Sequence, residues 1–356
     1  MNLRSLFRKR ESSVYGLDHA ILNIPIPPPS MWMNLGYWKD TSDFPTACAA
    51  LLDQVLITAG LLNENGDPTS HSPEKLRLLD VGIGCGDQSV RILGYKRGGD
   101  GNGNGNGNES PLPLFNSYVG ITSLPIQAEF ASQRISSKAE SDSESKSEPN
   151  QHARIFCADA ANPPSWPPEL RSSVTPFQDA DANPGASGKG PTEAEKEKEI
   201  ETENWLLALD TLYHFHPSRG PLLKYTHSTL HASLMAFDLL LQSPSSSSSK
   251  QISLWTRLLL RLLCLLSGTP YSNFLTEEEY TALLVRSGYE AEKIVFRDIS
   301  ADVFPGIAGF IKRRGEVVKG YGLGGGSMGK FRGAGAVFGW WARTGVVKGV
   351  VVVARV

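Results

Sequence analysis

The sequence predicts an α/β fold built on a parallel sheet of about seven strands. Short apolar runs typical of strands recur along the 356 residues, and helix-like stretches stand between them. This alternation indicates βαβ units and a parallel sheet. Alternating glycines follow the first run, as a turn into a helix beside a bound ligand requires. The expected strands are 76–81, 118–121, 153–157, 205–209, 234–240, 293–297 and 346–354.

Four low-complexity stretches interrupt this pattern, and we expect them to be disordered loops. They are rich in Gly and Asn or in Ser, Glu and Lys, so none can bury enough apolar surface to offset the entropy cost of ordering. The predicted organisation is an N-terminal arm, 1–70, followed by one domain, 71–356. The inserts fall near 97–110, 136–151, 168–203 and 243–250.

Helical signals lie between and after the strands. Residues 88–93 follow the glycine turn directly. In 276–287, Thr276 and Glu279 form a capping-box pattern, and Gly288 is a natural stop. The stretch 252–266 is apolar nearly all round. Such a helix is usually buried between the sheet and a lid, whereas a membrane surface with its two arginines facing headgroups is the alternative.

Composition and charge restrict the function classes. The formal net charge of −2 argues against a nucleic-acid partner, which requires a basic field. The four cysteines form no C-x-x-C pair, and no His, Asp or Glu cluster has ligand spacing, so no metal site or disulfide framework is indicated. A reducing, cytoplasmic location is expected. The basic residues 1–10 leave a mitochondrial presequence open, and no apolar run reaches the roughly 18 residues that span a bilayer.

The strongest functional signal is the run Leu-Leu-Asp-Val-Gly-Ile-Gly-Cys-Gly-Asp at 78–87. An apolar strand ends in Asp80, and glycines follow at 82, 84 and 86. A dinucleotide fingerprint requires G-x-G-x-x-G, and this spacing does not match it. The alternatives are a glycine-lined site for a different cofactor and a structural turn without a ligand.

This D-x-G-x-G-x-G run resembles motif I of the class I S-adenosylmethionine-dependent methyltransferases. The resemblance extends over most of the chain apart from the inserts. It implies a Rossmann-like three-layer sandwich whose seven-stranded, mostly parallel sheet has an antiparallel last strand. It also implies S-adenosylmethionine as the cofactor. Gly82, Gly84 and Gly86 would line its amino-acid and ribose portion, and Asp80 would hold its ammonium end directly or through water.

The second and third strands extend this resemblance. The run at 120–127 is similar to the branch that contains cyclopropane-fatty-acid synthases and related small-molecule methyltransferases, where Thr122 and Gln127 would contact the ribose. Many class I members carry an acid at Thr122, and an ordinary strand end is the alternative interpretation. After the third strand, Asp159 would accept a hydrogen bond from the adenine amino group, and the backbone amide of Ala160 would read the ring.

The fourth strand leads into Tyr213, His214 and Phe215, which resemble an aromatic-His-Phe triplet beside the transferring methyl group. Histidine suits a general base because its ordinary pKa is near neutrality. His214 is therefore a candidate catalytic base, with Tyr213 a candidate acceptor contact. The alternative for His214 is a structural histidine that orients Asp210 or the loop. His216 is expected to be an exposed loop residue.

Two further segments are candidates for the acceptor side. The aromatic run 31–38 resembles an N-terminal element that closes over cofactor and acceptor, which makes Tyr37 a catalytic candidate and Trp38 an acceptor contact. Anchoring of the arm on the core is the alternative. Asp298, in Asp-Ile-Ser, resembles an element that walls the acceptor pocket, and a solvated turn is the alternative.

These signals together predict an enzyme, a transferase that methylates a small-molecule or lipid-like acceptor by in-line transfer. Methylene transfer to an alkene, as in cyclopropane synthases, and a non-catalytic binding protein of the same fold are the alternatives. Peripheral membrane contact is left open. The sequence indicates neither the acceptor, nor the atom that is methylated, nor the oligomeric state.

Overall fold

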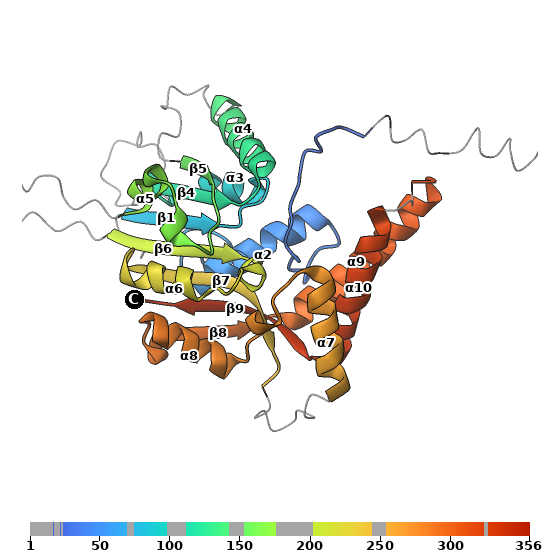
Figure 1. The fold of residues 1–356 in the computed structure, drawn as a ribbon. Coiled ribbons are helices and arrows are strands. Elements are labelled where there is room, and N and C mark those ends of the chain that lie inside the picture. The colour runs from blue at the N-terminus through green and yellow to red at the C-terminus, as the bar shows by residue number, and fades with distance from the viewer. Residues whose placement is uncertain are drawn as a thin grey trace, which may run out of the picture.

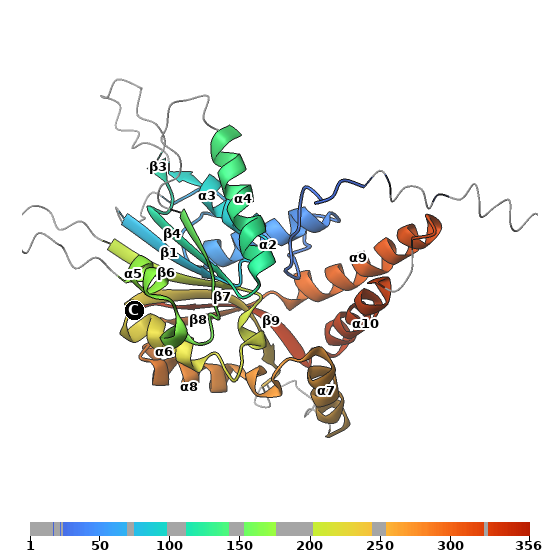
Figure 2. The same cartoon turned by 45° about the horizontal axis from the view of Figure 1, so that its top comes forward.

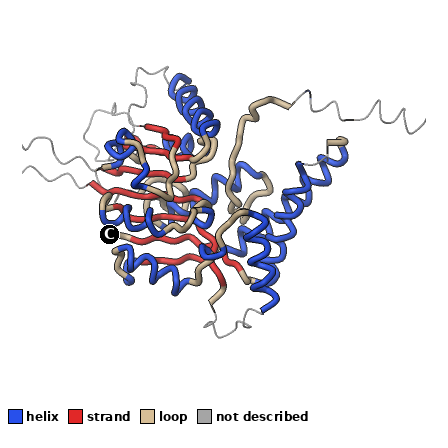
Figure 3. Tube along the Cα trace, viewed as in Figure 1, coloured by secondary structure: helices blue, strands red, loops and turns tan. Residues whose placement is uncertain are grey.

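The computed structural model describes residues 17, 22, 24–69, 75–97, 112–141, 153–175, 202–243, 254–323 and 327–356. Within these ranges a seven-stranded sheet lies between helices on its two faces (Figure 1), and the tube in Figure 3 shows the strands gathered at the centre. No helix in the described ranges combines the length and the apolar character needed to cross a bilayer.

The sheet has the order β5-β4-β1-β6-β7-β9-β8. Its first five strands in this order run parallel, and β9 is antiparallel to both of its neighbours, β7 and β8. The predicted fold class, including the antiparallel last strand, is confirmed. The strands are β1 Lys75–Val81, β4 Ser117–Thr122, β5 Ala153–Cys157, β6 Thr202–Leu209, β7 Ala232–Leu241, β8 Ile294–Asp298 and β9 Val347–Ala354, with a separate pair of β2 Lys96–Arg97 and β3 Leu112–Pro113.

The central strands are continuous apolar runs because both faces of the sheet are covered. Successive residues of β6 illustrate this: Trp205 and Leu207 belong to one apolar cluster, whereas Leu206 belongs to the other. The first cluster includes residues of α2, Phe44–Thr58, and α3, Asp87–Gly94. The second includes residues of α5, Pro168–Val174, α6, Gly220–Ser228, and α8, Glu277–Ser287.

Helix α8 has the predicted boundaries. The Thr276 hydroxyl accepts from the Glu279 amide, the Glu279 carboxylate accepts from the Thr276 amide, and Gly288 ends the helix with a φ of 118°. Low-complexity composition predicted disordered loops at positions where the structure has helices. Helix α4, Pro125–Ser141, includes the first residues of the second stretch, and α5 occupies the start of the third. The other residues of these two stretches, 142–151 and 176–201, and of the remaining stretches lie largely outside the described ranges.

The glycine-rich region after β8 forms two helices that the sequence did not indicate. They are α9, Ser300–Gly320, and α10, Ser327–Thr344, and they pack side by side (Figure 2). Glycine permits close packing between these helices and also between α9 and the N-terminal arm. A Cβ on Gly335 of α10 would lie 3.0 Å from the Ile311 side chain of α9, and a Cβ on Gly306 of α9 would lie 2.1 Å from the Trp38 ring of the arm.

The expectation that the apolar helix is buried is wrong. Helix α7, Leu254–Ser267, buries only Leu260 and Cys264, and most of its leucines are exposed. The helix lies at the same end of the molecule as α9 and α10 (Figures 1 and 2), and it contributes only these two residues to the first apolar cluster.

We predict that Gly86 is required for packing as well as for backbone conformation. A Cβ here would lie 2.7 Å from Cα of Ala131 in α4, and φ is 86°. Gly66 has almost the same φ, 85°, but no atom within 4 Å, which makes it a matched control. Gly66→Ala should lower the free energy of unfolding by about 1–2 kcal/mol through backbone strain alone. Gly86→Ala should lower it by a further ~1–3 kcal/mol. Equal losses in urea titrations would contradict the packing role.

Candidate functional site

A cavity of about 460 Å³ lies at the carboxyl ends of β1, β4, β5 and β6. Parallel strands direct their carboxyl ends to one edge, which is where ligands bind in open α/β sheets. The wall consists of the segments at or after the ends of these four strands, together with the N-terminal arm. The lining residues fall at 31–34, 82–85, 87–88, 121–123, 127, 158–160, 209–211 and 213–216.

The three glycines after β1 have different roles. Gly82 and Gly84 line the cavity with φ values of 77° and 56°. The position that a Cβ of Gly82 would take is occupied by the Thr211 side chain, 2.4 Å away, whereas the nearest atom to a Cβ of Gly84 is the Met33 sulfur at 3.3 Å. Gly84 is therefore the glycine at which a side chain would project toward the cavity. Gly86 packs against α4 and is absent from the cavity wall.

Asp80 lies behind the wall rather than in it. Its side chain is fully buried, and it accepts hydrogen bonds from Gln88 Nε2 at 2.8 Å and from the Tyr118 hydroxyl at 2.7 Å. Burial raises the pKa of Asp80 to about 7, against the lowering effect of these hydrogen bonds. Gln88 lines the cavity, so Asp80 acts on the wall by holding Gln88.

The structure brings together the predicted residues from β4 and β5. The buried Thr122 hydroxyl donates to Gln127 Oε1 at 2.7 Å, and Gln127 Nε2 lies 3.5 Å from the Met33 sulfur. Asp159 accepts from the Ala161 amide at 2.9 Å, and Trp166 donates to its carbonyl at 2.8 Å. Thr122, Gln127, Asp159 and Ala160 all line the cavity.

Asp210 is a site residue that the sequence reasoning did not select. It follows β6 directly with a φ of 58°, a conformation uncommon for a residue with a side chain. Its carboxylate accepts from the Leu35 amide of the arm at 2.8 Å and from the Tyr213 hydroxyl at 2.9 Å. Burial raises its pKa to about 7. The available signal was an acid at the end of a central parallel strand, as for Asp80 and Asp159.

The N-terminal arm is fixed over the glycine turn by a second carboxylate. Asp87, at the start of α3, accepts from the Met31 amide at 3.1 Å and pairs with Arg134 of α4 at 2.9 Å. Asp87 and Asp210 thus hold the arm at two points, 31 and 35, and the arm between them closes one side of the cavity.

The turn after β6 carries the candidate base. His214 and His216 both line the cavity. His214 Nδ1 lies 3.3 Å from the Thr269 hydroxyl, and His216 Nε2 donates to the Gly268 carbonyl at 3.0 Å. Burial, together with His216, lowers the pKa of His214, so the ring is neutral near pH 7 and can accept a proton. The Tyr213 ring centroid is 4.2 Å from that of His214.

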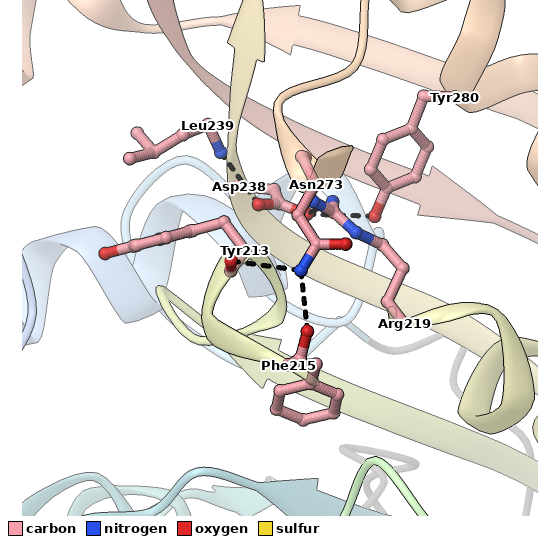
Figure 4. Close-up of polar contacts among 7 residues, drawn as sticks. All are labelled: Tyr213, Phe215, Arg219, Asp238, Leu239, Asn273 and Tyr280. Atoms are coloured by element: carbon pink, nitrogen blue, oxygen red, sulfur yellow. Dashed lines mark hydrogen bonds and ion pairs between the residues drawn. The ribbon is translucent and has the colours of Figure 1, made fainter. Parts of the chain in front are cut away.

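A buried polar cluster holds this turn in place, as Figure 4 shows. Asn273 Nδ2 donates to the carbonyls of Tyr213 and Phe215 at 3.1 and 2.7 Å. The Asn273 carbonyl in turn accepts from Arg219, which forms an ion pair with Asp238 of β7. Both side chains of this pair are almost fully buried, and the Tyr280 hydroxyl of α8 donates to Asp238 at 3.1 Å. The cluster therefore links β7, α8 and the candidate base.

The three residues predicted for catalysis or acceptor contact outside the turn after β6, Tyr37, Trp38 and Asp298, also lie away from the cavity wall. Trp38 is buried between Phe44 and Phe310, with ring centroids 6.2 and 5.3 Å away, so it anchors the arm on α9. Tyr37 packs against the first apolar cluster, and burial with the nearby Asp302 raises its pKa.

Asp298 accepts from the Ser300 amide at 3.0 Å at the start of α9 and pairs with Lys348 at 3.1 Å. These contacts are those of a helix start and a surface ion pair. Trp38 and Tyr37 therefore match the alternative interpretation, in which they anchor the arm on the core. Asp298 matches its own alternative, a turn at the surface.

The charge of the wall restricts the ligand. Asp87, which pairs with Arg134, lines the cavity together with Asp159 and Asp210, and no lysine or arginine lies in the wall in the part of the chain that the structure describes. An acidic wall of this kind attracts a cation and disfavours a pyrophosphate. Among the described residues, no group of three or more His, Cys, Asp or Glu side chains is arranged to hold a metal ion.

Comparison with known proteins gives structural matches only. No model of a protein family matches the chain, and no curated protein matches its sequence. A putative sarcosine dimethylglycine methyltransferase from Galdieria sulphuraria has a TM-score of 0.54 at 10% identity, covering 95% of this chain and 98% of its own. The mycolic acid cyclopropane synthase CmaA1 in its apo form has a TM-score of 0.53 at 12% identity, covering 91% and 94%.

The same synthase has also been solved with SAH and CTAB bound, and that structure matches with a TM-score of 0.51 at 12% identity, covering 91% of this chain and 90% of its own. At sequence identities this low, the matches show the fold alone. The chain has the Rossmann-like fold of these methyltransferases.

Proposed function

We propose that the chain is an S-adenosylmethionine-dependent methyltransferase that acts on a small-molecule or lipid-like acceptor. The observation that carries the proposal is the cavity itself. A glycine turn opens into it after β1, its wall holds three aspartates, and no described lysine or arginine faces it. A sulfonium cofactor matches this charge, and a dinucleotide does not.

The residues present fit the cofactor in two parts. Gly84 would leave room for its amino-acid and ribose portion, Gly82 lets the Thr211 side chain pack against the turn, and Gln88, which Asp80 holds, lines the same cavity. In this proposal the hydrogen-bonded pair of Thr122 and Gln127 would contact the ribose hydroxyls, and Asp159 with the Ala160 amide would contact the adenine, since all four residues line the cavity. When bound, the cofactor supplies an electrophilic methyl carbon. The arm over the cavity limits the access of water to it.

His214 is the proposed general base. In an in-line transfer the acceptor's nucleophile forms a bond to the methyl carbon as the carbon–sulfur bond breaks, and the acceptor loses a proton. A neutral imidazole beside the cavity can take this proton. Tyr37 lies outside the cavity wall and has no direct part in the proposed methyl transfer.

Methylene transfer to an alkene is the second candidate, since the fold matches a cyclopropane synthase. Deuterated cofactor separates the two reactions. A methyl transferred from a trideuteromethyl donor retains all its deuterium, whereas formation of a cyclopropane ring removes one deuterium to a base. Cofactor binding without turnover of a broad acceptor panel would instead favour a non-catalytic binding protein.

We predict that purified protein binds S-adenosylmethionine and S-adenosylhomocysteine, and that Gly84→Val abolishes this binding. The valine side chain would enter the cavity beside Met33. Gly66→Val, at another positive φ with no atom near, controls for backbone strain and should bind normally. Titration calorimetry is the measurement. Absence of binding by the wild type would end the proposal.

His214→Ala should leave cofactor affinity within a few-fold and lower turnover by roughly 10²–10⁴, the contribution of a positioned acid or base. In the wild type, activity should fall on the acid side as His214 becomes protonated, below the ordinary histidine pKa because burial lowers it here. The variant should lack this fall. A structural histidine would instead lower stability and cofactor affinity together. Wild-type turnover in the variant would remove His214 from the mechanism.

Asp210 should make cofactor affinity depend on pH. Its carboxyl is neutral below a pKa of about 7 and negative above it, so affinity for the sulfonium should rise as pH increases through 7. S-adenosylhomocysteine shares the ammonium but lacks the sulfonium charge, and its affinity should rise less. Asp210→Asn should remove the difference in pH dependence between the two affinities. If that difference is unchanged in the variant, Asp210 does not interact with the sulfonium charge.

A further inference from the structure

Helix α7 presents a large apolar face to solvent. Trp255 is 81% exposed and Leu265 is 78% exposed, although both are large apolar side chains. Exposed apolar patches on this scale mark interaction sites, because a monomer in water gains nothing from them. The exposed set is Leu254, Trp255, Leu258, Leu259, Leu262, Leu265 and Leu266.

These side chains form one surface. At 100° per residue, the seven positions fall within one arc of about 140° around the helix. Leu260 and Cys264, which pack on the core, lie on the opposite side. Arg261 and Arg257 follow on one side of the arc, about 20° and 60° beyond it, and long side chains can extend from an apolar layer toward charged groups.

Charge identifies the class of partner. The helix contains two arginines and no acid, and α9 and α10 stand at the same end of the molecule (Figures 1 and 2). The three helices together carry nine lysines and arginines against two acids, whereas the whole chain has a net charge of −2. A cationic, apolar end of this kind complements an anionic lipid surface. Pairing with a second copy would oppose two positive faces.

The face adjoins the cavity. Helix α7 ends at Ser267, and the next two residues contact the cavity wall: the Gly268 carbonyl accepts from His216, and the Thr269 hydroxyl lies 3.3 Å from His214. Leu265 and Leu266 therefore stand within one turn of residues that touch the candidate base.

We propose that α7 docks the protein on an anionic lipid surface, with its leucine face in the interfacial layer and Arg257 at the headgroups. Docking places the cavity mouth against the lipid, so that a lipid-like acceptor reaches His214 without crossing water. Only this last clause rests on the proposed function. The docking itself requires neither cofactor nor turnover.

Co-sedimentation with vesicles tests the docking. Wild-type protein should bind vesicles that contain phosphatidylglycerol, bind pure phosphatidylcholine vesicles weakly, and lose binding as salt rises. Leu262→Glu should weaken binding roughly tenfold or more. Arg257→Gln should weaken it about fivefold; Arg261 is left unchanged because its guanidinium stacks on Tyr271, 5.1 Å from the ring centroid. Val285→Glu on α8, a comparably exposed site at 45% against 51% for Leu262, should bind as wild type.

Trp255 supplies an independent readout on the unmodified protein. Its emission should shift to shorter wavelength with anionic vesicles, and Trp255→Phe should remove the shift. Absence of wild-type vesicle binding, or equal binding by Leu262→Glu and Val285→Glu, would overturn the proposal. A dimer that Leu262→Glu dissociates, without vesicle binding, would assign the face to a second copy.

Cofactor calorimetry separates this proposal from the proposed function. Wild-type affinity in Leu262→Glu establishes that the variant is folded. Protein that binds vesicles but not S-adenosylmethionine would contradict the methyltransferase proposal alone, and protein that binds only the cofactor would contradict docking alone.

Discussion

The buried ion pair of Arg219 and Asp238 is the constraint on which the acceptor side depends. Such a pair adds little net stability, because desolvation of two charges offsets most of their attraction, but loss of one partner leaves an uncompensated charge that costs about 3–5 kcal/mol. Arg219 also donates to the Asn273 carbonyl, and Asn273 holds the turn around His214. The orientation of the candidate base is therefore tied to the interior of the sheet, and a variant that disturbs the pair should displace the base as well.

On the other side of the cavity, aspartates at or just after strand ends accept hydrogen bonds from other segments. Asp87 and Asp210 bind amides of the arm, and Asp80 holds Gln88. Each contact satisfies a buried or partly buried polar group, so displacement of the arm breaks the hydrogen bonds of its amides to Asp87 and Asp210. Burial raises the pKa of both Asp80 and Asp210 to about 7.

The strands were predictable because burial on both faces of the sheet demands continuous apolar runs, and the glycine turn was predictable because only glycine fits its dihedrals. The pair α9 and α10 was not, because their glycines read as breakers although Gly306 and Gly335 serve close packing. Local signals placed Thr122, Asp159 and His214 at the cavity. They could not place Tyr37 and Trp38, whose side-chain directions depend on α9, far along the chain.

The two sides of the cavity come from different chain segments and differ in their chemistry. Asp87 and Asp159 line the cavity beside β1 and β5, whereas the turn after β6 brings an imidazole whose lowered pKa keeps it neutral and able to accept a proton. The two halves meet at Asp210 and Tyr213, joined by a hydrogen bond of 2.9 Å. Ionisation of Asp210 changes the charge of the cavity wall and the acceptor of the Tyr213 hydroxyl at the same time. The Tyr213 ring is tilted by 43° against that of His214, with centroids 4.2 Å apart, so one side chain contacts both the carboxylate and the histidine.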